Sequence, residues 1–202
     1  MICILDYGSG NVGSVYNVIK FLGYEVIISN KSEDIINSSH LILPGVGAFP
    51  SSMEKILSSI PIDTLEDEVL KKGKPFLGIC VGMQVLATKG FEKNECKGLG
   101  WIEGTVERIE SDKLALPHIG WNDIEFIQDN SLSDSFKDIN DFYFVHSYCF
   151  KEKNHKNSIA KVTYGSKFNA IVQKDNIFGF QFHPEKSQRA GQLILKNFFK
   201  MS

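Results

Sequence analysis

The clearest structural signal in the chain is a ten-residue segment, PFLGICVGMQ at residues 75–84. Residues 75–79 form a short apolar run that is typical of a buried strand, and the run leads directly into Cys80. Gly78 and Gly82 stand two residues before and two residues after this cysteine. Such glycine spacing is typical of a sharp turn from a strand into a helix, where larger side chains would collide. The segment therefore predicts a strand, a tight turn that presents an exposed thiol, and a helix.

The residues before this segment alternate between strand-like and helix-like patterns. Residues 12–22 place apolar side chains on one helical face, and Gly23 follows as a stop signal. Pro50 and Pro61 suit the first turns of two short helices that end before Gly73. Strands that alternate with helices form βαβ units, so this half predicts a mainly parallel central sheet flanked by helices. We expect its strands at residues 2–5, 24–28, 40–43 and 75–79.

The pattern changes at about Gly98, after which strand-like runs follow one another with few helical patterns between them. The chain closes on a helix, because apolar residues from Ala190 to Phe198 recur at helical spacing. There is no internal repeat and no convincing linker, so we expect a single α/β domain over residues 1–202 with an additional antiparallel strand region. The expected strands of this region are residues 99–109, 121–126, 142–150, 159–164, 169–173 and 177–182.

Composition and charge exclude several classes of protein. The formal net charge is −2, from 22 basic and 24 acidic residues, and no basic cluster suggests a nucleic-acid partner. No apolar run approaches the roughly 18 residues that span a membrane. The four cysteines show no C-x-x-C pattern and the five histidines no ligand spacing, so we predict no metal and no cofactor. These features favour a cytoplasmic protein with reduced thiols.

A glycine-rich segment, GSGNVG at residues 8–13, matches the G-x-G-x-x-G pattern of dinucleotide-binding loops. That fingerprint also requires an acidic residue at the end of the second strand, and residues 28–31 contain none. Asp6 and Tyr7 also separate the first strand from the first glycine. A turn that needs glycine for its backbone geometry is therefore the favoured interpretation, with nucleotide binding the weaker alternative.

Cys80 is a candidate nucleophile because the turn would place its thiol at a helix N-terminus. The helix dipole and a nearby imidazole would both favour the thiolate. The backbone N–H of Val81 would then form half of an oxyanion hole. The alternative is that Cys80 is a small buried apolar residue, which is common for cysteine. The paired glycines favour the nucleophile, provided that the chain supplies a base.

GFQFHPE at residues 179–185 supplies that base. Glu185 follows His183 by two residues across a proline, so its carboxylate can orient the imidazole. Cys80, His183 and Glu185 are therefore a candidate catalytic triad. In PGVGAF at residues 44–49, the amides of Val46 and Gly47 could complete the oxyanion hole beside Val81, although alone this loop would be only a flexible turn.

Several motifs occur in a fixed order along the chain: DYGSGN at residues 6–11, PGVGAF at 44–49, the cysteine turn at 75–84, PHIGWN at 117–122, FVHSY at 144–148 and HPEKS at 183–187. Together they resemble the triad-type, or class I, glutamine amidotransferases, and the likeness runs nearly from end to end. The motif at residues 6–11 narrows the resemblance to the glutaminase subunits of imidazole glycerol phosphate synthase. The resemblance implies a flavodoxin-like fold in which the first glycine loop, around Asn11, lies toward a partner subunit.

The resemblance also implies a reaction. Cys80 would attack the carboxamide carbon of L-glutamine, and hydrolysis of the resulting thioester would give glutamate and ammonia. Gln84 and Glu92 match positions that hold the amino-acid head of the substrate, and Ser147 with Tyr148 matches the segment whose backbone receives its carboxylate. The ammonia would pass to a (β/α)8-barrel cyclase in a heterodimer of histidine biosynthesis, and glutaminase activity would be weak until that partner and its ligand are bound.

Three alternatives stay open at this stage. The same glutaminase could serve a different acceptor synthase, such as one that adds nitrogen to a surface sugar. The chain could be a catalytically silent regulatory subunit, although all three triad residues are present. It could also be a stand-alone cysteine hydrolase or peptidase, which would turn over substrate without a partner.

Overall fold

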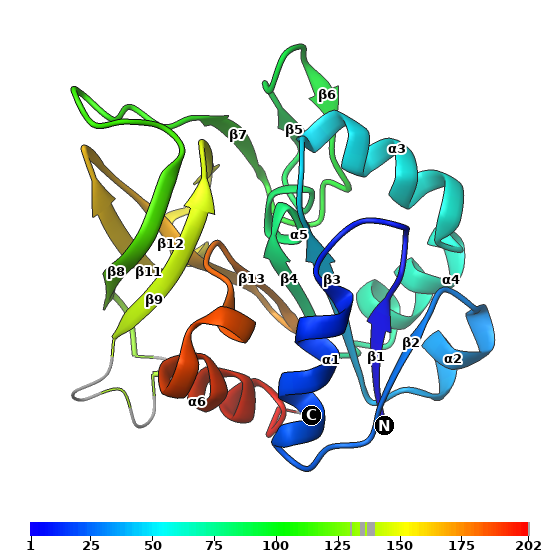
Figure 1. Ribbon diagram of the computed structural model, residues 1–202. Coiled ribbons are helices and arrows are strands. Elements are labelled where there is room, and N and C mark those ends of the chain that lie inside the picture. Colours follow the sequence, from blue (N-terminus) through cyan, green and yellow to red (C-terminus); the bar gives the residue numbers. More distant parts are fainter. Residues whose placement is uncertain (130, 134–135, 137–139, 202) are drawn as a thin grey trace.

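The computed structural model describes residues 1–129, 131–133, 136 and 140–201, and a large mixed sheet runs through it (Figure 1). The nine strands have the order β2-β1-β3-β4-β13-β12-β11-β8-β9. The first five are parallel neighbours, and their sequences are short apolar runs because both faces of this part of the sheet are covered. These parallel strands are β2 (Val26–Ser29), β1 (Ile2–Leu5), β3 (His40–Gly45), β4 (Phe76–Cys80) and β13 (Ile177–Phe180).

The other end of the same sheet is antiparallel. β13 is the boundary strand, because it pairs in parallel with β4 on one side and antiparallel with its neighbour on the other. The prediction that placed residues 177–182 in the antiparallel region was therefore wrong on one side of this strand, which also ends earlier, at Phe180. The predicted α/β fold with an additional antiparallel region is therefore confirmed. The antiparallel strands are β12 (Ser166–Lys174), β11 (Ser158–Tyr164), β8 (His118–Phe126) and β9 (Asp141–His146).

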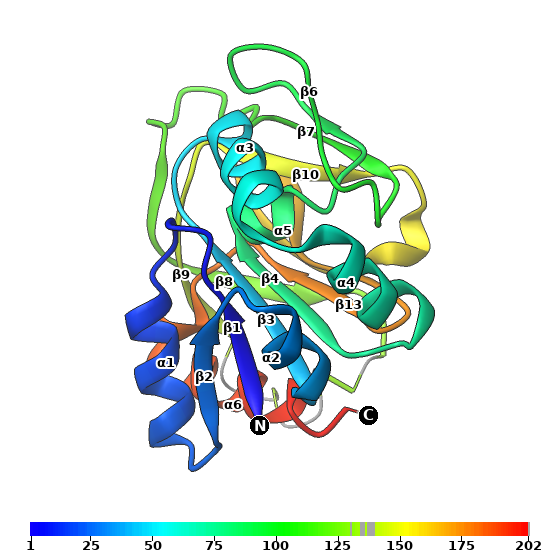
Figure 2. The same cartoon turned by 90° about the vertical axis from the view of Figure 1, so that its right-hand side faces the viewer.

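Helices cover both faces of the parallel half (Figures 1 and 2). On one face lie α1 (Val12–Phe21) and α6 (Gln188–Phe198); on the other lie α2 (Ser32–Asn37), α3 (Phe49–Ser59), α4 (Ile62–Glu66) and the π-helical turn Asp67–Lys71. A short helix, α5 (Val81–Gln84), follows β4 directly. The 3₁₀ turns are His155–Asn157 and Pro184–Lys186. No helix in the described part of the chain is long and apolar enough to cross a membrane.

Proline and glycine set helix boundaries largely as the sequence indicates. Pro50 lies in the first turn of α3, as predicted, whereas Pro61 is one residue earlier than predicted and precedes α4. Gly23, after α1, has φ +87°, a conformation that favours glycine. In α6, Ile194 and Phe198 are buried as the helical spacing predicts. Leu193, which belongs to the same predicted face, is only half-buried, and Leu195 is buried instead.

A smaller sheet of four strands packs beside the antiparallel half, and it contains the main errors of the sequence prediction. Residues 142–150 were predicted as one strand but form two, because β9 ends at His146 and the chain crosses at Ser147 into the second sheet. Residues 99–103 are not a strand, since their amides donate to carbonyls of residues 85–87. The strands of this sheet are β10 (Tyr148–Glu152), β7 (Gly104–Arg108), β5 (Lys89–Gly90) and β6 (Cys96–Lys97).

Candidate active site

Steric constraint builds the turn at Cys80. A side chain at Gly78 would place its Cβ 2.2 Å from the carbonyl oxygen of Gly82, and one at Gly82 would place it 1.9 Å from that of Leu43. Both distances are far below van der Waals contact, so only glycine fits at either position. Cys80 itself has φ +56° and ψ −110°, a strained conformation that is rare for any residue with a side chain. The glycines thus permit the close turn that the sequence predicted.

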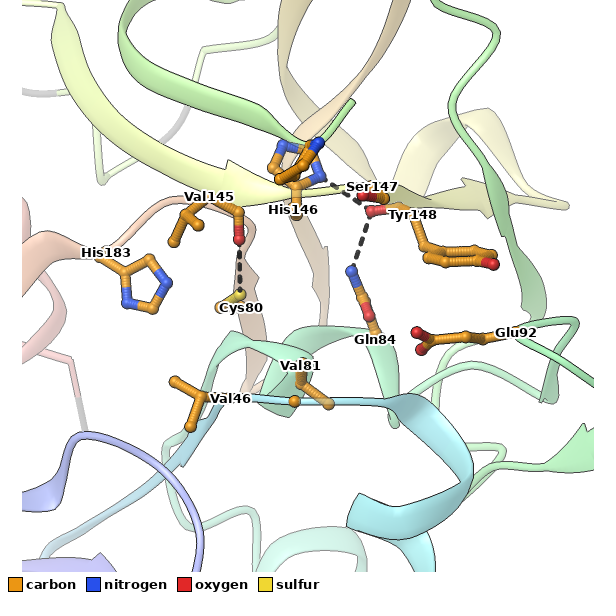
Figure 3. A pocket seen from close by; sticks show the side chains of 12 residues that line it. Val46, Cys80, Val81, Gln84, Glu92, Val145, His146, Ser147, Tyr148 and His183 are labelled. Atoms are coloured by element: carbon orange, nitrogen blue, oxygen red, sulfur yellow. Dashed lines mark hydrogen bonds between the residues drawn. The ribbon is translucent and has the colours of Figure 1, made fainter. Parts of the chain in front are cut away.

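The thiol of Cys80 is less exposed than the sequence suggested. The residue is only 3% exposed, because the segment at Val145 passes over it at the floor of a cavity (Figure 3). The thiol lies 4.0 Å from the carbonyl oxygen of Val145, and the buried Gln181 directs its amide Nε2 at the sulfur from 3.9 Å. A substrate therefore reaches the sulfur through the cavity.

His183 and Glu185 form a buried pair beside the cysteine. His183 Nδ1 and a Glu185 carboxylate oxygen are 2.8 Å apart, and the side chains are 2% and 1% exposed. A carboxylate only accepts hydrogen bonds, so Nδ1 carries a proton, and Nε2 is the nitrogen left to exchange a proton with Cys80. Burial alone would lower the pKa of His183, but the neighbouring Cys80 and Glu185 favour its charged form and raise that pKa above its usual value of 6.5.

The turn that carries this pair is fixed by close packing. Ser187 donates its hydroxyl to the carbonyl of His183 at 2.6 Å. A Cβ on Gly191 of α6 would lie 1.8 Å from the carbonyl oxygen of Pro184, so α6 approaches the turn as closely as backbones allow. These contacts hold Glu185 behind His183, out of the cavity that Cys80 faces.

A cavity of about 340 Å³ joins most of the predicted residues (Figure 3). Its volume lies in the range of small-molecule sites. Two predicted residues do not line it: Glu185 lies behind His183, and Asn11 lies just before α1. The predicted residues that line the cavity are Val46, Gly47, Cys80, Val81, Gln84, Glu92, Ser147, Tyr148 and His183.

The end of the cavity away from His183 is polar. Gln84 Nε2 donates to the carbonyl oxygen of Tyr148 at 2.9 Å, which ties α5 to the start of β10. Glu92 accepts a hydrogen bond from the backbone N–H of Phe49 at 2.7 Å, so its carboxylate is fixed in the wall. A fixed carboxylate beside amide and backbone groups suits the ammonium and carboxylate of an amino acid.

The candidate oxyanion groups lie on the opposite wall. Val81 begins α5, and the first amides of a helix have no partner within the helix. Gly47 has φ +102°, which only glycine adopts readily, and the Val46 carbonyl accepts a hydrogen bond from Ser9 Oγ at 2.9 Å. The first glycine loop therefore contacts the second one, and Gly10 permits their close approach, because a Cβ on Gly10 would lie 2.7 Å from the Pro44 oxygen.

Four residues of the site were not assigned a role from the sequence. Pro117, Val145 and His146 line the cavity, and Gln181 contacts the thiol. In an alternating strand pattern Gln181 and His183 fall on the same face, so the sequence holds a signal for Gln181. Within the described residues, no group of three His, Cys, Asp or Glu side chains could hold a metal ion.

Comparison with known proteins gives a consistent result. The family model "Glutamine amidotransferase class-I" matches residues 3–201. Curated relatives named as imidazole glycerol phosphate synthase subunit HisH include chains from Methanococcus maripaludis (44% identical, all of both chains covered), Campylobacter jejuni (43%, all of both) and Vibrio vulnificus (46%, 98% of this chain and 92% of the relative).

Solved structures show the same fold at low sequence identity. One is described as PurLQS from Thermotoga maritima, with a TM-score of 0.76 at 17% identity, covering 98% of this chain and 97% of that one. Another, described as a glutamine amidotransferase, has a TM-score of 0.74 at 19% identity with the same coverage. At these identities the likeness concerns the fold alone.

Proposed function

The chain belongs to the class-I glutamine amidotransferase family, and from this premise we propose that it is the glutaminase subunit of an imidazole glycerol phosphate synthase. One observation carries the catalytic part of the proposal: a His183–Glu185 pair beside Cys80 at the floor of an amino-acid-sized cavity. Full-length identity of 43 to 46% with relatives named as HisH subunits supports the assignment to histidine biosynthesis.

The first half of the reaction forms a thioester. His183 Nε2 takes the proton of the Cys80 thiol, and the thiolate attacks the carboxamide carbon of L-glutamine. The carbonyl oxygen gains negative charge, which the amides of Val46, Gly47 and Val81 are proposed to stabilise. When the intermediate collapses, the carbon–nitrogen bond breaks, and the imidazolium gives its proton to the departing nitrogen, which leaves as ammonia.

The second half reverses these roles. His183 removes a proton from a water molecule, whose oxygen attacks the thioester carbon. The carbon–sulfur bond then breaks, glutamate leaves, and Cys80 regains its proton from the imidazolium. Glu185 keeps Nδ1 protonated throughout, so that Nε2 always faces the reacting atoms. The raised pKa of His183 favours the imidazolium, the form that gives its proton to the departing nitrogen.

The polar end of the cavity holds the amino-acid head of glutamine. We assign the ammonium to the carboxylate of Glu92 and the amide of Gln84, and the carboxylate to the backbone of Ser147 and Tyr148. Cys80 and these groups line one cavity, so a single glutamine can reach both ends. The chemistry of each end matches the charge that it would bind.

The second part of the proposal is a partner, a (β/α)8-barrel cyclase that receives the ammonia in a heterodimer in the cytoplasm. The names of the relatives, which describe a subunit, support it. On this chain, Ile119 and Trp121 of β8 are 59% and 45% exposed, close in sequence to Pro117 at the cavity. Exposed apolar side chains beside a reaction site suit a protein interface. Asn11, before α1, is the interface residue that the family resemblance suggests.

A second candidate keeps the chemistry and changes the acceptor. Several relatives carry the number 1 or 2 in their names, which indicates organisms with more than one such subunit. Duplicate subunits can serve different synthases, including ones that aminate surface sugars.

The test is glutamate release from L-glutamine by the chain alone, and with an imidazole glycerol phosphate synthase cyclase and its ribonucleotide ligand. We expect strong stimulation by the cyclase, abolished by Cys80→Ala. Activity that the cyclase does not stimulate would favour the second candidate, or a stand-alone hydrolase. A complete absence of glutamate release would contradict the proposed chemistry.

A further inference from the structure

The backbone at Tyr148, where the substrate carboxylate is proposed to bind, is held by two side chains. Gln84 donates to the Tyr148 carbonyl from one side, and His146 approaches it through Nδ1 at 2.8 Å (Figure 3). This carbonyl lies where β9 ends and the chain crosses to β10 in the other sheet. The backbone N–H of Ile109 holds the Ser147 carbonyl at 2.9 Å, and the two side-chain bonds hold the next carbonyl, that of Tyr148.

A chain of hydrogen bonds continues behind His146. Its Nε2 lies 3.2 Å from Nδ1 of His118, whose own Nε2 lies 3.2 Å from the amide nitrogen of Asn122. That amide nitrogen also donates to the carbonyl of Thr163 at 3.0 Å. The chain therefore leads from the cavity wall, through two buried rings, to the backbone of β11.

The direction of every bond in this chain follows from its two ends. The Tyr148 carbonyl only accepts, so His146 carries its proton on Nδ1. Burial lowers the pKa of His146 to about 3 and that of His118 to about 4, so both rings are neutral at pH 7 and each has one proton. His146 Nε2 must then accept from His118 Nδ1, and His118 Nε2 must accept from the Asn122 amide. Each ring nitrogen has a partner of the correct type.

Strand register and packing keep the two rings together. His118 and His146 are direct partners in the β8–β9 pairing, so their side chains project to the same face. The His118 ring stacks between Phe144 and Tyr164, with centroid distances of 4.9 and 4.1 Å. Rotation of the His118 ring would break these stacking contacts as well as its hydrogen bonds.

We propose that His146, supported by His118, is a positioning residue that orients the Ser147–Tyr148 backbone for the carboxylate of glutamine. The inference rests on the proposed function. Apolar side chains would fill the same volume without the desolvation cost of two buried imidazoles. The polar chain instead ends on the Tyr148 carbonyl in the wall of the reaction cavity, and it holds the peptide group that directly follows the Tyr148 amide.

The test measures L-glutamine affinity by isothermal titration in a Cys80→Ala background, which cannot turn the substrate over. We expect His146→Leu to weaken binding about tenfold, the effect of losing one buried hydrogen bond that orients a ligand-binding group. His146→Asn should restore most of the affinity, because its amide nitrogen occupies the place of Nδ1. His118→Leu, one step further away, should weaken binding less.

His40 provides a matched control. It is also a buried histidine, bonded to Ser39 and to the Met201 carbonyl, but it does not line the cavity. His40→Leu should lower the stability as His146→Leu does while leaving glutamine affinity unchanged. If His146→Leu binds glutamine as tightly as the parent, as His40→Leu is expected to do, the positioning role is wrong. If the parent itself does not bind glutamine, the proposed function fails, and this inference fails with it.

If His146→Leu does not fold, a spectroscopic measurement on the unmodified chain tests the positioning role of His146. Nitrogen NMR should show both His118 and His146 neutral, with the proton on Nδ1. Glutamine is then added to the Cys80→Ala chain. A change in the exchange rate of the His146 Nδ1 proton, or a shift of the His146 ring signals, would link the ring to the bound substrate. A proton on Nε2 of His146 would overturn the inference, because that tautomer cannot donate to Tyr148.

Discussion

The parallel and antiparallel halves of the large sheet build the site in different ways. In the parallel half, backbone contacts too close for any Cβ fix Cys80, and the neighbouring loop lies against the same turn. Where the antiparallel half ends, the Ser147–Tyr148 crossing to the smaller sheet is held by hydrogen bonds from the Gln84 and His146 side chains, with one backbone bond from Ile109. The boundary strand β13 leads to His183, so this histidine lies where the two halves of the sheet meet.

This difference separates the part of the site that reacts with the substrate from the part that binds it. Strain and steric fit position a nucleophile with little freedom, which favours bond formation at one place. A hydrogen-bonded segment positions a carboxylate site that a single side chain can disturb. We therefore expect variants of the parallel half to change catalysis or folding, and variants of the antiparallel half to change glutamine affinity.

The largest effect is expected from Cys80→Ala. Removing the nucleophile of a triad enzyme costs a factor of up to about 10⁶ in rate. Glutamate release in the cyclase complex should fall by at least about 10⁴-fold, while glutamine affinity stays close to that of the parent. Cys96→Ala, at the half-exposed cysteine of β6, is the matched control and should retain full activity. Residual activity in Cys80→Ala would show that another group carries the reaction.

Glu185→Gln should have the next largest effect. The amide can still bond to Nδ1 but can also favour the wrong tautomer, and a comparable change in another triad costs about 10⁴-fold in kcat. The loss of charge should also lower the pKa of His183, since Glu185 is one of the groups that raise it. Rate measurement and imidazole NMR check both expectations. An unchanged His183 pKa would contradict the assigned role of this carboxylate.

Gly78→Ala should destabilise the chain by about 1–3 kcal/mol, the usual cost of overpacking, because its Cβ would lie 2.2 Å from the Gly82 oxygen. Gly13→Ala is the matched control: it lies in α1 with nothing within 4 Å of its Cβ, so it should be neutral or stabilising. Urea unfolding compares the two. Equal stabilities would mean that the turn at Cys80 is not sterically fixed.

The antiparallel half should add a pH dependence to stability. His118 and His146 have pKa values lowered by burial to about 4 and about 3, against 6.5 in the unfolded chain. Between about pH 4 and 6.5 the unfolded state binds more protons, so stability must rise with pH in this window and be complete above it. Each group contributes up to about 1.4 kcal/mol per pH unit. Urea unfolding at several pH values should show a shallower slope for His118→Asn than for the parent; an equal slope would contradict the burial of a neutral ring.

The same division explains how much the sequence could predict. The turn at Cys80 and the pair at His183 and Glu185 depend on neighbours within a few residues, so their spacing is visible in the sequence. Four of the five parallel strands were found for the same reason, since each is a short apolar run. The fifth, β13, was found as a strand but was placed in the antiparallel region, because its parallel partner β4 is distant in the sequence. The fold class followed from them.

The antiparallel half depends on partners far apart in the chain. His118 and His146 are 28 residues apart, and only strand register brings them together. The crossing at Ser147 was missed because strand-like residues continue from Phe142 to Phe150, although the two parts of this run belong to different sheets. Residues 99–103 pack under α5 through backbone bonds that no apolar pattern shows.

The most direct test of the central claim, that Cys80 is the nucleophile for glutamine in this cavity, is covalent labelling with a chloroketone analogue of glutamine. The thiolate would displace chloride and form one stable thioether, which peptide mass spectrometry can locate. We predict a single adduct on Cys80, slowed by L-glutamine and absent after His183→Ala. Labelling of Cys96 or Cys149 in place of Cys80, or labelling that glutamine does not slow, would contradict the account.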